Sequence, residues 1–275
     1  MGARELTDRS NQQAARPAAR RRAPVIWPWL LVGAAWTLAL VAVLTNQGSL
    51  INHHYLLEQS HLPVLVALVV FLAGWQVMTV AMMLPSSMPM LSLMVRISRG
   101  QWRVTYLPHA IPLAFLAGYA VIWTGFAAAA FLGDALIHQM VHYWFWLYLH
   151  SSLIGATTLA LAGSFQFSPL KQGCLKQCRR PLRFLRHSYP SGIGGAWHLG
   201  LRYGVLCLGS CWALMLVMFG LGVGSLVSMA LLTEVMVVEK TFPGGRCLSR
   251  VIGGALLGLA VVWLVHPVWL SMTGV

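Results

Sequence analysis

The apolar residues of this chain lie in long runs that alternate with shorter polar stretches. A helix needs roughly 20 mainly apolar residues to cross a bilayer, and seven runs are close to that length or longer. We predict that each run is a membrane-spanning helix. The predicted limits, good to a few residues, are Val25–Leu44, Leu62–Val95, His109–Leu132, Tyr143–Ala162, Tyr203–Val223, Leu226–Phe242 and Val251–Leu270.

The stretches between these runs predict the connections. Pro85 and Pro89 are expected to interrupt the last turns of the second helix. Asp134 to His142 is predicted to be a short connection, and Phe165 to Gly200 the longest one after the tail. The first run is too long for a typical signal-peptide core, so we expect it to be retained. Residues 1–24 are predicted to be a disordered basic cytoplasmic tail, and residues 25–275 a single seven-helix membrane domain.

Composition and charge agree with a lipid environment. Hydrophobic residues make up 58% of the chain and charged residues 9%, which cannot supply the wetted surface of a soluble globule. The net charge of +13 could suggest nucleic acid, but all 19 Lys and Arg lie in the tail and the 96–108, 165–202 and 239–250 connections. The positive-inside rule places these segments together in the cytoplasm. We therefore predict an all-α, polytopic helix bundle in the inner membrane, with the N-terminus inside, the C-terminus outside and no nucleic acid partner.

Two of the predicted helices carry stripes of sulfur. The second has Met78, Met82, Met83, Met88 and Met90 within thirteen residues. The fifth has Cys207, Cys211 and Met215 at i, i+4 and i+8, which is nearly one helix face. Because these helices run in opposite directions, both stripes are expected in the cytoplasmic half of the bilayer.

Thiolates and thioethers are soft ligands suited to Cu(I). We predict that the metal ligands are Cys207, Cys211, Met78, Met82, Met83 and Met215. The alternative is that flexible Met side chains and small buried thiols serve only helix packing.

Secondary candidates lie nearer the ends of the helices. Cys174 and Cys178 form a C-x3-C pair among basic residues, and the segment is either a thiol pair that exchanges metal or an amphipathic helix whose basic face meets anionic lipid. His138 and His142, on the outer side, either hold a metal ion or are solvated. Glu239 is either a carboxylate ligand or the partner of the adjacent Lys240.

One more carboxylate has a predicted position. Glu234, in the middle of the sixth predicted helix, is expected to face the bundle because an ionisable group in lipid is costly.

Common enzyme and nucleotide-binding motifs are absent from the sequence. It contains no P-loop, no G-x-G-x-x-G after a strand, no H-E-x-x-H and no G-x-S-x-G. A catalytic acid would have to come from six carboxylates, two of them in the tail. We therefore predict a non-enzymatic protein without a nucleotide cofactor.

Four motifs, taken in order, are more specific than any one of them alone. They are W-x2-M-x3-MM-x-P from Trp75 to Pro85, Gln166 followed by PLK-x2-CL-x2-CR from Pro169 to Arg179, C-x3-CWALM from Cys207 to Met215, and Glu239-Lys240. Together they resemble an uncharacterised bacterial family of predicted metal-binding integral membrane proteins, sometimes labelled copper chaperones. The chain departs from that pattern at Gly209-Ser210, where many relatives are expected to have a further Cys.

The leading hypothesis is a membrane protein that handles Cu(I) by storage, delivery or passage across the bilayer. Its expected partners are the lipid bilayer and a metallochaperone or metalloenzyme, and the oligomeric state is left open. Two alternatives are an assembly or scaffold subunit of a membrane complex, and a subunit of a membrane oxidoreductase.

Overall fold

The protein is described by a computed structural model over residues 26–45, 63–101, 110–143, 152–188, 192–221, 226–242 and 244–265. Every regular element in these residues is an α-helix, which confirms the all-α helical bundle. The helices are α2 (Trp27–Leu44), α4 (Val64–Gln101), α5 (Ala110–Tyr143), α7 (Ser152–Gln166), α8 (Pro169–Cys178), α9 (Pro181–Ser188), α10 (Ile193–Leu221), α11 (Leu226–Thr241) and α12 (Gly245–Val265). The predicted tail lies outside the described residues.

Five of the described helices, α2, α4, α5, α10 and α12, are long and apolar enough to cross a membrane. A sixth span is possible by length if α7 and α8, which meet at a bend of 64°, count as one. The 16-residue α11 is shorter than a full crossing requires. Length and composition therefore support five or six spans, and the seventh stays a prediction.

Helix α4 continues through Pro85 and Pro89, so the predicted interruption is wrong. A proline inside a helix leaves the carbonyl four residues earlier without its usual N–H donor. For Pro85 that carbonyl belongs to Ala81, and the indole Nε1 of Trp36 on α2 donates to it at 3.2 Å. The neighbouring helix thus replaces the lost hydrogen bond, and α4 remains unbroken.

Two predicted connections are also largely helical. Helix α5 runs to Tyr143 because the stretch from Asp134 to His142 contains no Gly or Pro that would end it. The predicted connection from Phe165 to Gly200 contains α8, α9 and the first turns of α10. Ser168 starts α8 by accepting a hydrogen bond from the backbone N–H of Leu170 at 3.2 Å.

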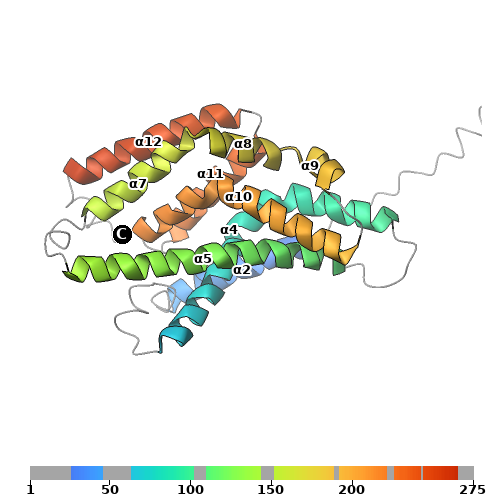
Figure 1. The fold of residues 1–275 in the computed structure, drawn as a ribbon, viewed down its shortest axis with the longest axis horizontal. Coiled ribbons are helices and arrows are strands. Elements are labelled where there is room, and N and C mark those ends of the chain that lie inside the picture. Colours follow the sequence, from blue (N-terminus) through green and yellow to red (C-terminus); the bar gives the residue numbers. More distant parts are fainter. Residues whose placement is uncertain are drawn as a thin grey trace, which may run out of the picture.

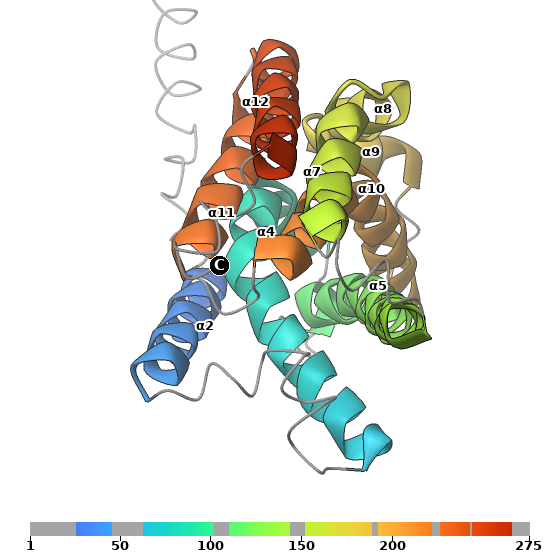
Figure 2. The same cartoon turned by 90° about the vertical axis from the view of Figure 1, so that its left-hand side faces the viewer.

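The helices pack around α10 and α4. Helix α10 packs most extensively against α5 and also contacts α7, α8 and α11, while α12 pairs with α7. Figure 2 shows α4 passing between α2 and α11 on one side and α5 on the other. In Figure 1 the carboxyl end of α4, the short helix α9 and the amino end of α10 lie on the right-hand side, and α8 leads to α9 from the middle of the molecule. The basic residues of α9 therefore lie at one end of the bundle, and those of α8 lead toward that end.

The contact between α5 and α10 depends on glycine. A Cβ atom added at Gly200 would lie 2.1 Å from the backbone oxygen of Phe115, and one added at Gly118 would lie 2.5 Å from the backbone oxygen of Trp197. Each glycine thus meets the backbone of the opposite helix, which has no flexible side chain to move aside. The close approach positions the rest of α10.

We predict that Gly200→Ala lowers stability because the added methyl group forces α5 and α10 apart. Overpacking typically costs about 1–3 kcal/mol, and this clash with backbone should lie at the upper end. Gly194→Ala, on the same helix with nothing within 4 Å of the added Cβ, is the matched control. Thermal unfolding of the purified variants in detergent measures the difference. Equal midpoints for the two variants would show that the helices do not approach this closely.

Candidate metal centre

Cys207 and Cys211 lie one turn apart on α10, and both are buried. The Cys207 sulfur is hydrogen-bonded to the hydroxyl of Tyr119 on α5 at 3.1 Å. The Cys211 sulfur is hydrogen-bonded to the hydroxyl of Ser210 at 3.1 Å. Both thiols therefore lie in the interior with polar neighbours and without contact to solvent.

A buried ammonium group connects Cys207 to two other helices. Lys240, at the carboxyl end of α11, donates to the sulfur of Cys207 at 3.0 Å and to the hydroxyl of Ser86 on α4 at 3.0 Å. The Lys240 residue is only 6% exposed. One cation thus holds α4, α10 and α11 at a common level.

This contact relates the two sulfur stripes. Met82 precedes Ser86 by one turn and Cys211 follows Cys207 by one turn. Since α4 and α10 run in opposite directions (Figure 1), Met82 and Cys211 both lie roughly 6 Å along the helix axes on the same side of Lys240. By the same reasoning, Met78 and Met215 lie two turns away, roughly 12 Å. The stripes are therefore level with each other, as the sequence predicts.

The predicted methionine ligands share the same core. Met78 is 4% exposed, and Met82, Met83 and Met215 are fully buried in the hydrophobic cluster that also contains both cysteines. Met83 follows Met82 directly, so it faces a different direction around α4. Its backbone carbonyl accepts hydrogen bonds from the Ser86 and Ser87 hydroxyls at 2.8 Å and 3.1 Å.

Helix α8 brings a second pair of thiols to α10. Its buried face includes Lys171, Leu175 and Cys178, and Cys174 is half-buried beside them. A Cβ atom at Gly209 would lie only 2.8 Å from the sulfur of Cys174. The glycine therefore makes room for a sulfur from α8, on the face of α10 opposite to the one that carries Cys207 and Cys211, since residues two apart on a helix do not share a face.

Glu239 and Lys240 do not pair with each other in the structure. The carboxylate of Glu239 accepts a hydrogen bond from the buried Lys171 of α8 at 2.8 Å. Lys171 also donates to the side chain of Gln166, and Arg179 donates through Nε to the backbone oxygen of Glu239 at 2.8 Å. Glu239 thus joins α8 to α11, and its role as a metal ligand stays a prediction.

The predicted direction of Glu234 differs from the observed one. Glu234 is exposed on the surface of α11, so the expectation that it faces the bundle is wrong. The register of α11 explains this, because the buried face is set by Met229, Leu232, Met236 and the final Glu239-Lys240 pair.

His138 and His142 both lie in α5, four residues apart. Their side chains fall outside the described residues.

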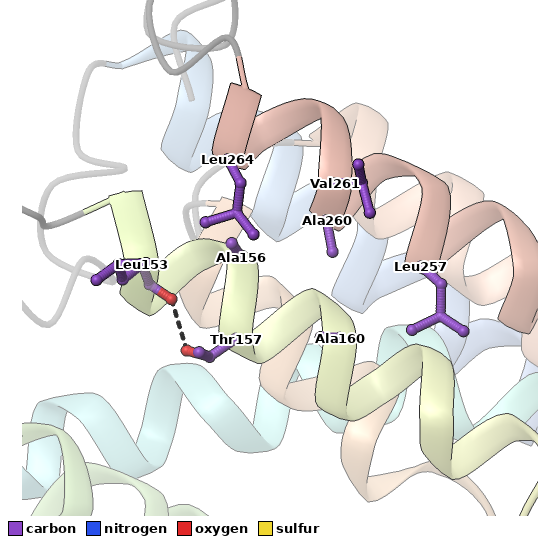
Figure 3. Close-up of a pocket in the computed structure, with 8 residues that line it drawn as sticks. All are labelled: Leu153, Ala156, Thr157, Ala160, Leu257, Ala260, Val261 and Leu264. Atoms are coloured by element: carbon purple, nitrogen blue, oxygen red, sulfur yellow. Dashed lines mark hydrogen bonds between the residues drawn. The ribbon is translucent and has the colours of Figure 1, made fainter.

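The described residues contain no group of three or more His, Cys, Asp and Glu that could hold a metal ion. A site with three or more ligands in this part of the chain would therefore have to combine thiols with other groups, such as methionine thioethers. A cavity of about 220 Å³ between α7 and α12 is lined by neither thiols nor thioethers (Figure 3). It is lined by Leu, Ala and Val side chains and by Thr157, whose hydroxyl donates to the backbone oxygen of Leu153 at 2.7 Å.

Sequence reasoning did not find Lys240, Tyr119 and Ser86 as members of this site. The signals available for Lys240 were its position at the end of an apolar run and its place in the Glu239-Lys240 motif. Tyr119 and Ser86 become recognisable only once α5, α10 and α4 are known to meet.

Comparison with known proteins adds independent evidence. Residues 72–263, well over half of the chain, match the model of a family described as copper chaperone. No curated protein and no solved structure matched the chain. The matched residues include α5, α7, α8, α9, α10 and α11, all the cysteines and most of α4. The chain belongs to this copper chaperone family, as the order of its sulfur motifs predicted.

Proposed function

We propose that the protein binds Cu(I) inside the helix bundle and passes it to another protein or across the membrane. The proposed ligands are the thiolates of Cys207 and Cys211, with Met82 as the first thioether and Met78, Met83 and Met215 in the adjoining turns. The observation that carries this proposal is the contact of Lys240 with both Cys207 and Ser86, because it sets the methionines of α4 level with the cysteines of α10.

The charges of such a site would balance. Two thiols that bind Cu(I) release two protons, so the two thiolates and the ion together carry one negative charge. A buried net charge is costly without a nearby opposite charge. The ammonium of Lys240, already in contact with Cys207, supplies that charge. Oxygen-ligated ions such as Mg²⁺ would find no comparable set of carboxylates among the described residues here.

The thiols of α8 suggest how the ion could leave. Cys174 is half-buried, whereas Cys207 and Cys211 are fully enclosed. Its sulfur lies against α10 at Gly209, level with the two proposed ligands but on the opposite face of the helix. The exchange we propose therefore requires α8 to shift: a Cys174 thiolate then forms a bond to Cu(I) as one bond to Cys207 or Cys211 breaks, and the copper stays in the +1 state. Cys178 is the second acceptor, and a metallochaperone or metalloenzyme receives the ion.

The proposed placement of this protein is the bacterial inner membrane, with the end that carries α8 in the cytoplasm. Five or six apolar helices and the basic residues gathered on α8 and α9 support this placement. The proposed role is non-enzymatic. Capture of copper by His138 and His142 on the outer side stays part of the same proposal.

We predict that changing both Cys207 and Cys211 to Ser abolishes tight Cu(I) binding. The purified protein is loaded under reducing, oxygen-free conditions and titrated against a Cu(I)-specific chelator of known affinity. The exposed Cys247→Ser is the control and should bind like the wild type. Met82→Leu should weaken binding while keeping the side-chain volume. Unchanged copper stoichiometry in the double variant would contradict the site.

We further predict that Gly209→Ala slows copper release without lowering the amount bound. The new methyl group displaces the Cys174 sulfur from α10, so the effect should match that of Cys174→Ser. Gly173→Ala, next to Cys174 on α8 with nothing within 4 Å of the added Cβ, is the control. The rate of copper transfer to the chelator is the measurement. Wild-type rates in both Gly209→Ala and Cys174→Ser would remove Cys174 from the exit path.

A further inference from the structure

A second, polar cavity lies between α8 and the start of α12. Its volume is about 630 Å³, and its polar lining is formed by Gln172, Lys176, Arg179, Arg180 and Cys247. The apolar cavity of Figure 3 differs from it in every lining residue. Three cationic side chains therefore share one concave surface at the end of the bundle that carries the basic residues.

No carboxylate lines this cavity. The nearest candidate by sequence is Glu239, but its side chain is buried and paired with Lys171. Arg179 is held by its hydrogen bond to the backbone oxygen of Glu239, so its guanidinium has a defined position at the cavity wall. Like charges held together favour an anion from outside the chain. Guanidinium groups in particular match the oxygens of a phosphate.

The cavity also borders apolar surface. The apolar stretch of α12 that could cross a membrane begins at Cys247, which itself lines the cavity. Val251, one turn further along α12, is 63% exposed. Phe242, just beyond α11 and two residues before Gly244 of the cavity lining, is 62% exposed. A ligand with an anionic head and apolar tails would fit both surfaces.

We propose that this cavity binds the phosphate headgroup of an anionic membrane lipid. Lys176 and Arg180 attract the phosphate, Arg179 contacts its oxygens, and the acyl chains lie along α12. Basic pockets between helices on the cytoplasmic side of membrane proteins are suited to such headgroups. The inference relies on the proposed membrane placement but is independent of copper binding.

A bound phosphate would also affect the proposed copper site indirectly, through the backbone at the end of α11. Arg179 is bonded to the carbonyl of Glu239, and the next residue, Lys240, contacts Cys207. Lipid at the cavity therefore steadies the end of α11 from which Lys240 extends.

The exposed Cys247 thiol provides a direct readout. The copper-free protein is placed in nanodiscs of phosphatidylcholine alone, or with part of it replaced by phosphatidylglycerol. The rate at which an uncharged maleimide modifies Cys247 is followed by peptide mass spectrometry. We expect the anionic lipid to slow this reaction severalfold. The ratio of rates in the two lipids is the quantity compared between variants.

Lys176→Gln combined with Arg180→Gln should bring that ratio close to one. Arg183→Gln combined with Arg202→Gln removes the same charge from exposed positions outside the cavity and should keep the wild-type ratio. An equal slowing in both double variants would mean a general effect of an anionic surface and would overturn the proposal. Protection by inorganic phosphate in neutral nanodiscs, without protection by the lipid, would assign the cavity to a soluble phosphate compound instead. Failure of the chain to enter nanodiscs would also overturn the proposal, whatever the outcome of the copper titrations.

Discussion

The ammonium group of Lys240 is the contact on which the arrangement of the sulfur site depends. A buried cation costs several kcal/mol unless polar partners surround it, so its partners are fixed once the helices pack. Those partners are the sulfur of Cys207 on α10 and the hydroxyl of Ser86 on α4. A single side chain from α11 therefore sets the relative height of two helices that carry nearly all the proposed ligands.

The adjacent Glu239 extends this arrangement to α8. Its carboxylate pairs with Lys171 and its carbonyl accepts from Arg179, both on or next to α8. Neighbouring residues of opposite charge thus point to different helices instead of to each other. The short α11 thus contacts α4, α8 and α10, and two of these helices, α8 and α10, carry four of the five cysteines.

The helical class and the sulfur stripes could be predicted from the sequence because both follow from local periodicity. The family resemblance came from the same motifs. Helix ends were harder, since α4 continues through Pro85, where Trp36 of another helix bonds to the freed Ala81 carbonyl. The roles of Lys240 and Tyr119 could not be predicted from the sequence either, because each role depends on which helices pack together. Glu234 shows the same limit, since the register of α11, and not the cost of the charge alone, decides which way it faces.

Gly209 has a consequence for how sulfur is supplied. The sulfur of Cys174 on α8 fills the space that a side chain at this position would take. A thiol on α10 itself would keep a fixed distance from Cys207 and Cys211, whereas the position of Cys174 follows that of α8, which meets α7 at a 64° bend. The missing side chain thus makes the distance from Cys174 to the proposed copper ligands depend on how two helices pack.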